Sequence, residues 1–196
     1  MIGIECSIMG DNIHNNFCKK TCVVIVELGG RTMRSSESKF NNSYLLYTFI
    51  RGINFEIEQD IRNTLKKSNF SFPSFRILWI LYFQNDMTMS DLAHIAQTNI
   101  SNIFRQLIKL KDEGFVLIEN GADARMKNVK LTVSGKEMVN NFIQENQRHS
   151  ELKIVETIEK ISEEELKVAL KVVALLSSEL VGDKFTSFIM KSHEAL

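Results

Sequence analysis

The fold is decided by residues 90–137, SDLAHIAQTNISNIFRQLIKLKDEGFVLIENGADARMKNVKLTVSGKE. In the first half of this stretch, apolar residues recur every three or four positions, which is the spacing of one helix face. The pattern is interrupted only around Gln97-Thr98 and then resumes. Two short helices joined by a tight turn are therefore predicted in series.

The ends and inner faces of these two helices can also be assigned. Ser90 and Asn99 are the expected N-caps, with Asp91 near the positive end of the first helix. Gly114 is expected to end the second helix as a C′ glycine. The side chains predicted to point into a core are Leu92, Ile95, Ala96, Ile103, Leu107 and Leu110.

A β-hairpin follows the helix pair. Residues 115–120 and 128–134 are predicted strands, because Val129, Leu131 and Val133 alternate with polar residues. Between them, GADARMK has the composition of a turn. The loop between the two strands therefore carries an Asp and an Arg two positions apart.

Further helices are predicted on both sides of this region. Apolar residues spaced three and four apart predict amphipathic helices over 44–65, 136–160 and 163–181. The last of these begins with a capping box formed by Ser162 and Glu165, and GDKFTSFIMKSHEAL looks like one more short helix.

One very apolar segment, SFPSFRILWILYFQ, is compatible with a helix or with a buried strand. Pro73 suits a first helical position, and Phe75, Leu78, Trp79 and Tyr82 are in helical register. A helix is therefore favoured here.

Composition limits the class of protein. The 196 residues contain only one proline and nine glycines, which favours a mainly α protein with a small β-hairpin. No stretch approaches the roughly 18 apolar residues of a membrane span, and no secretion signal starts the chain. A cytoplasmic protein is expected.

The formal net charge of zero hides a small asymmetry. Residues 88–136 hold seven Lys and Arg against five Asp and Glu, whereas residues 137–196 hold seven against eleven. The basic middle permits an anionic partner without requiring one.

Residues 1–32 are expected to form a leader that is disordered or not natively translated. Gly29-Gly30-Arg31-Thr32-Met33 can be encoded by a ribosome-binding site followed by a start codon, so Met33 is the hypothetical natural start. All three cysteines lie in this leader, and their spacing matches no paired zinc motif.

Helix, short turn, helix and a hairpin with a cationic tip, in this order, form the layout of a winged helix-turn-helix. In that layout the second helix enters the major groove of DNA, where Asn102 and Arg105 can read base edges and Lys109 and Lys111 can meet phosphates. Asp123 can hold the Arg125 guanidinium in one pose. The predicted DNA contacts are Asn99, Ser101, Asn102, Arg105, Lys109 and Lys111 from the helix, and Asp123, Arg125 and Lys127 from the hairpin.

Each residue also has a simpler interpretation. Arg105 and Lys109 on an exposed helix face ordinarily only solvate the surface, and an Asp-x-Arg turn can be a surface ion pair worth under about 1 kcal/mol. The order and spacing of these features carry the inference, and a winged-helix protein-interaction module without direct DNA contact is the alternative.

The stretch 90–137 resembles the winged-helix segment of MarR-family transcriptional regulators. The shared motifs are Leu92-Ala93, Leu110 to Gly114, and Asp123-x-Arg125 followed by Val-x-Leu-Thr-x-x-Gly. ILWILY, ISNIF and GDKFTSFI further resemble the Hpr branch, whose members repress protease and sporulation genes in Gram-positive bacteria. One departure is the turn between the two helices, commonly Gly-Val in the family and Gln97-Thr98 here, which affects the expected pitch of the recognition helix.

The resemblance covers residues 40–190 and implies a winged helix over about 72–135, flanked by dimerisation helices over about 40–68 and 137–190. It implies a homodimer that binds double-stranded DNA at a pseudo-palindromic operator, most often as a repressor. Terminal amphipathic helices agree with this, since they carry more apolar surface than one small winged domain can cover.

No cofactor or metal is expected. Residues 33–196 lack cysteine, which argues against thiol sensing, and His94, His149 and His193 are far apart in sequence. A small-molecule effector of unknown identity stays open. An enzyme is not expected, because no phosphate-binding glycine loop, His-Glu-x-x-His motif or nucleophile elbow occurs.

Overall fold

The computed structural model describes residues 36–66, 70–120 and 127–196, so residues 1–32 and the hairpin tip with Asp123 and Arg125 lie outside the described residues. The chain divides into two units, Met1–Tyr44 and Leu45–Leu196. Of the first unit, the described part is the beginning of α1. Everything below concerns the second unit.

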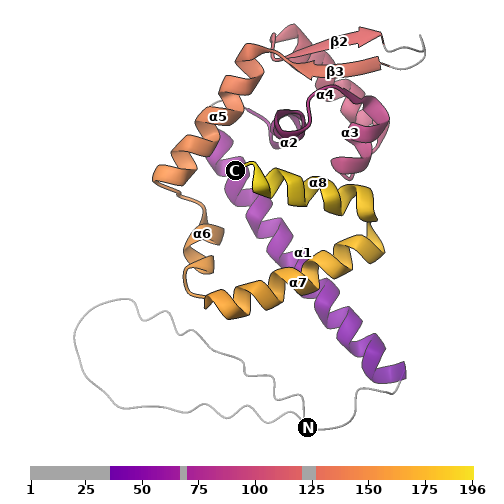
Figure 1. Cartoon of the computed structure of the whole chain (residues 1–196), viewed down its shortest axis with the longest axis vertical. Helices are drawn as coiled ribbons and strands as arrows, with labels where there is room; N and C mark the ends of the chain where they lie inside the picture. Colours follow the sequence, from indigo (N-terminus) through magenta and orange to yellow (C-terminus); the bar gives the residue numbers. More distant parts are fainter. Residues whose placement is uncertain (1–35, 67–69, 121–126) are drawn as a thin grey trace, which may run out of the picture. The chain divides into compact units, whose positions relative to one another are not determined.

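Helices dominate the described chain, and one small sheet interrupts them (Figure 1). The elements in order are α1 (Ser36–Lys66), α2 (Phe72–Phe83), β1 (Met87–Thr88), α3 (Met89–Ile95), α4 (Ile100–Asp112), β2 (Val116–Asn120), β3 (Lys127–Leu131), α5 (Val133–Arg148), α6 (Lys153–Ile158), α7 (Glu163–Leu180) and α8 (Asp183–Glu194). The predicted fold class, mainly α with a small β-hairpin, is confirmed.

The sheet has the order β1-β3-β2 and is antiparallel throughout. Val116 lies opposite Leu131 and Ile118 opposite Val129, while Met87 of β1 pairs with Val129 from the other side. Because side chains alternate along a strand, Met87, Val116, Val129 and Leu131 all point into the core.

The core lies between α2, α3, α4, α5 and the inner face of the sheet. Its most deeply buried side chains are Ile77, Leu78, Leu81, Leu92, Ile103, Leu107, Leu110, Val116, Val129 and Val139. An aromatic cluster joins α2 to α5, with the Phe75 and Phe142 ring centroids 4.6 Å apart. All six residues predicted to point inward from the helix pair are buried, so that prediction is confirmed.

Helix α2 settles the choice left open for the very apolar segment. Ser71 accepts a hydrogen bond from the Ser74 backbone N–H, and Pro73 lies in the first turn. Both features stabilise a helix start, so the favoured helix is confirmed.

Three boundary predictions were wrong: the cap of α3, the end of the second predicted hairpin strand, and the helix predicted over 136–160. Thr88, not Ser90, caps α3, because pairing of β1 with β3 holds Thr88 extended directly ahead of the helix, where its hydroxyl accepts from the Asp91 N–H at 3.1 Å. Residues 132–134 are not strand. Thr132 is the N-cap of α5, and Val133 is exposed in its first turn.

The helix predicted over 136–160 is two helices. α5 ends at Arg148, and the backbone N–H of Lys153 donates to the Asp60 carboxylate of α1 at 2.6 Å as α6 begins. The capping box of Ser162 and Glu165 and the last short helix are confirmed. Within the described ranges, no helix combines the length and apolar content that a membrane crossing requires.

Candidate nucleic-acid interface

Helix α4 is anchored at both ends as its sequence predicts. The Asn99 side chain accepts from the Asn102 backbone N–H at 2.8 Å, and Gly114 takes a φ of +79°, which glycine adopts without strain. Ile103, Leu107 and Leu110 are buried beneath the helix. These contacts fix both the ends and the rotation of α4.

The outer side of α4 carries a row of polar residues, here called the polar ridge: Ser101, Arg105 and Lys109. All three are exposed, and they lie four residues apart, which places them along one edge of the helix. Lys109 approaches Glu113 at 3.7 Å, a surface ion pair that contributes little. Lys111 is also exposed, but it lies on a different side of the helix from Lys109.

Arg105 is held by its own helix. Its guanidinium donates to the Asn102 side-chain oxygen at 2.6 Å, and the Asn102 amide donates in turn to the Thr98 hydroxyl at 3.2 Å. Asn102 is half-buried, so it sets the direction of Arg105 more than it offers its own amide to a partner. The structure therefore brings Asn99, Asn102 and Arg105 together at the start of α4.

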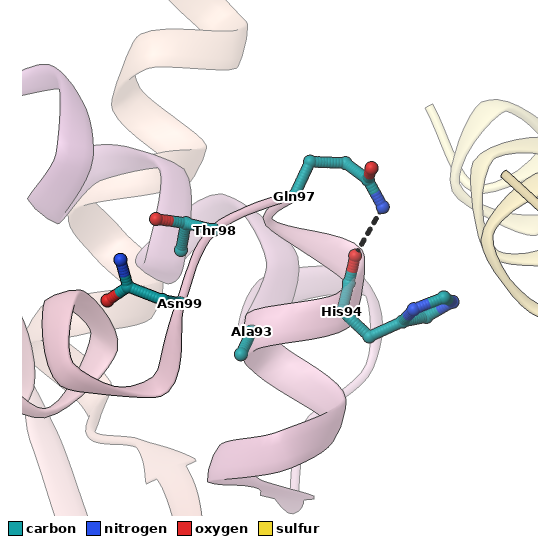
Figure 2. A pocket seen from close by; sticks show the side chains of 5 residues that line it. All are labelled: Ala93, His94, Gln97, Thr98 and Asn99. Atoms are coloured by element: carbon teal, nitrogen blue, oxygen red, sulfur yellow. Dashed lines mark hydrogen bonds between the residues drawn. The ribbon is translucent and has the colours of Figure 1, made fainter.

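The turn between α3 and α4 depends on Gln97, whose φ of +50° lies in the left-handed region (Figure 2). Figure 2 shows the Gln97 side chain reaching back to the His94 carbonyl oxygen, to which its amide donates at 2.6 Å. The Thr98 backbone N–H also donates to the Ala93 carbonyl at 3.0 Å. The left-handed conformation explains why a glycine suits this position in the family resembled, and the hydrogen bond offsets part of the strain in Gln97.

A cluster of charges joins α1, α2 and the end of α3, and sequence reasoning missed it. Arg76 donates to the Ala96 carbonyl at 3.1 Å and to the Glu58 carboxylate at 2.8 Å, while Arg62 meets the other Glu58 oxygen at 3.2 Å. Both guanidinium groups lie within 4.8 Å of the Phe72 ring centre. The partners are separated by up to 20 residues, so no local pattern announces them.

A second unpredicted contact joins α3 to α8. Lys184 donates to the Asp91 carboxylate, and α8 also buries Phe188 against the core. The hydrogen bond from Lys184, aided by the Thr88 hydroxyl and opposed by partial burial, lowers the pKa of Asp91 below its ordinary value of 3.8. The C-terminal helix is thus tied to the first helix of the pair.

The hairpin supplies one described candidate contact, Lys127, which is exposed at the start of β3. Lys130 further along β3 lies 2.8 Å from Glu119 and 3.6 Å from Asp86. The hydrogen bond to Glu119 and the nearby Asp86 charge raise the pKa of Lys130. Lys130 therefore links β3 to β2 and to Asp86, the residue just before β1. The predicted roles of Asp123 and Arg125 concern residues outside the described ranges.

No group of three or more His, Cys, Asp or Glu side chains suited to a metal occurs in the part of the chain that the structure describes. His94 lies at the turn, and His149 and His193 lie at helix ends elsewhere.

Known proteins share part of this sequence. The model of the MarR family matches residues 70–119, which run from α2 to the end of β2. The HTH-type transcriptional repressor IacR of Pseudomonas putida is 28% identical over 78 residues, 39% of this chain and 47% of IacR. The HTH-type transcriptional regulator Hpr of Lysinibacillus sphaericus is 29% identical over 84 residues, 42% of this chain and 45% of Hpr. The chain thus spans about half the length of these relatives.

Solved structures extend the likeness beyond the helix pair. S. aureus MepR in its DNA-binding conformation is 25% identical, with a TM-score of 0.56 over 67% of this chain and 97% of MepR. The MepR-DNA complex gives a TM-score of 0.59 at 24% identity, over 68% of this chain and 97% of that one. The chain has the winged-helix fold of these MarR-family structures, and its residues 70–119 match the family model. In this fold α3 and α4 correspond to the helix-turn-helix, and β2 and β3 correspond to the wing.

Proposed function

We propose that this protein is a sequence-specific DNA-binding transcriptional regulator of the MarR family. The observation that carries the proposal is the two-sided character of α4, which buries Ile103, Leu107 and Leu110 and exposes the polar ridge. A helix held by one side can enter the major groove, which is about 12 Å wide. The likeness to MepR, whose structures include a complex with DNA, supports this partner.

The residue roles follow from chemistry and exposure. Arg105 is proposed to read a base edge, because a guanidinium can donate twice to guanine. Asn99, Ser101 and Asn102 lie around it at the start of α4, where they can contact bases or position Arg105. Lys109 and Lys111 are proposed to meet phosphates, and Asp123, Arg125 and Lys127 to form the contacts of the wing.

The active form is proposed to be a homodimer. α7 has no buried residue, although it carries Leu170, Val173 and Leu175 with 59%, 55% and 62% of their surfaces exposed. α1 adds exposed Phe49 and Ile53. Apolar surface of this extent favours a partner, and a two-fold dimer would present two recognition helices about 34–36 Å apart on a pseudo-palindrome.

We further propose that binding represses transcription in the cytoplasm. IacR is named a transcriptional repressor, which supports this sign of regulation. A dimer that covers about two helical turns of a promoter blocks access by size alone. We propose no catalytic role for the chain and assign it no effector.

The test is a fluorescence-anisotropy titration of the full chain on duplexes enriched from a random pool. Affinity should fall steeply with salt, because phosphate contacts release counterions. Arg105→Ala should weaken enriched sites more than random DNA, whereas Lys111→Ala should weaken both alike. Lys160→Ala, which changes an exposed lysine just after α6, is the matched control. Salt-independent or undetectable binding would instead favour an interaction module without DNA contact.

A further inference from the structure

The exposed side of α4 carries a second row of residues that the polar contacts do not use. This apolar ridge consists of Ile100, Phe104 and Ile108, which expose 52%, 46% and 44% of their surfaces. Each lies one position before a member of the polar ridge, so the two ridges run side by side along the helix. At 1.5 Å per residue the apolar ridge is about 12 Å long.

The ridge is not needed to hold α4 on the core. Ile103, Leu107 and Leu110 already do so, with 1%, 0% and 0% of their surfaces exposed. Three large apolar side chains in a row at the surface mark a contact that is made when a partner arrives.

The charges beside the ridge indicate which partner it meets. Residues 100–111 contain Arg105, Lys109 and Lys111 and no carboxylate. An apolar protein surface can bind without such cations, whereas a duplex requires them for its phosphates. The occupant that combines a phosphate backbone with exposed methyl groups is the thymine-rich edge of the major groove, because thymine alone presents a C5-methyl group there.

We propose, on the basis of the proposed DNA-binding function, that Ile100, Phe104 and Ile108 determine specificity by packing against thymine methyl groups. The preferred half-site then holds thymines beside the base that Arg105 reads. Phe104 is the central member of the ridge and directly precedes Arg105 in the sequence. Polar and apolar readout therefore come from adjacent rows of one helix.

The experiment removes the methyl group and nothing else. Duplexes enriched by the full chain from a random pool are resynthesised with each thymine replaced, one at a time, by uracil, which pairs identically. Affinities are compared at one salt concentration by fluorescence anisotropy. At one or two positions in each half-site, uracil should weaken wild-type binding about fourfold, the loss expected for one buried methyl group.

Variants connect the effect to the ridge. Phe104→Ala should bind thymine and uracil equally at its position, while Phe104→Leu should retain part of the discrimination. Lys111→Ala should weaken both duplexes by the same factor. Because Phe104 is half exposed, the alanine variant should fold normally, which circular dichroism checks, and the uracil series on the wild-type protein needs no variant at all.

Each failure has its own signature. Tight binding to enriched duplexes with no uracil effect, or enriched half-sites without thymine, would overturn the role of the ridge and leave the DNA-binding function standing. No enrichment and no salt-dependent binding would overturn the DNA-binding function itself. Loss of self-association by Phe104→Ala in sedimentation, with DNA affinity unchanged, would assign the ridge to a protein contact and refute the proposal.

Discussion

Gly135 in the first turn of α5 permits a close approach to the backbone of Phe115, just before β2. A Cβ added at Gly135 would collide with the Phe115 carbonyl oxygen and lie 2.9 Å from the Leu131 Cδ2. The approach is fixed by Thr132, whose backbone N–H donates to the Phe115 carbonyl at 3.1 Å and whose hydroxyl donates to the Gly114 carbonyl at 2.8 Å. The Leu131 side chain can move, but the Phe115 carbonyl is held in place.

Gly135→Ala should therefore destabilise the protein. Overpacking of this kind costs about 1–3 kcal/mol, and the better helix propensity of alanine returns at most about 1 kcal/mol. The net loss of up to about 2 kcal/mol should lower the urea midpoint by up to about 1 M. Unfolding is followed by circular dichroism at one protein concentration, because self-association would add to the apparent stability.

Gly52→Ala is the matched control, since nothing lies within 4 Å of a Cβ built at that helical glycine. Alanine there should raise stability by about 0.5–1 kcal/mol. The two substitutions are chemically identical and opposite in expected sign. A Gly135→Ala protein that unfolds at the same urea concentration as Gly52→Ala, or a higher one, would refute the close approach.

Three more predictions concern the ties around the helix pair. Arg76→Met should lower the free energy of unfolding in urea by about 1–2 kcal/mol, because it removes the donor to Glu58 and to the Ala96 carbonyl while part of the site stays open to water. An unchanged urea midpoint would show that the hydrogen bonds of Arg76 do not contribute to stability. Asp91 has a lowered pKa in the folded state, so its ion pair with Lys184 stabilises the protein above pH 3.8 and is lost as pH falls through the lowered value. The acid-induced loss of stability below pH 3.8 should be shallower in Asp91→Asn than in the wild type, and parallel curves would contradict the role of the pair. Leu170→Asp combined with Val173→Asp should produce monomers in sedimentation equilibrium, and a dimer that survives both changes would place the interface elsewhere.

The helices were predictable where apolar residues repeat over several turns. The predicted helices over 44–65 and 163–181 have close counterparts in α1 and α7, and Asn99 and Gly114 mark the ends of α4 in the sequence itself. These signals are local, because a cap or a C′ glycine acts within one turn of the chain. The helical spacing also predicted the exposure of Arg105 and Lys109, whereas Asn102, which was expected on the same outward face, is half-buried.

The features that could not be predicted depend on contacts between residues that are far apart in the sequence. The cap of α3 is displaced to Thr88 by pairing with β3, and the break between α5 and α6 is fixed by Asp60, which is 93 residues from Lys153. The apolar ridge was not predicted, for a different reason. Ile100, Phe104 and Ile108 repeat at helical spacing, as the buried residues of α4 also do, and only the packing of the neighbours decides which row is covered.

The central claim is that α4 lies against duplex DNA. Hydrogen exchange measured by mass spectrometry on the full chain, with and without an enriched duplex, tests it directly. With the duplex bound, we predict slower hydrogen exchange over residues 99–112 and at the start of β3, and unchanged hydrogen exchange in α6. Protection confined to α6 and α7, with α4 exchanging at its free rate, would contradict it.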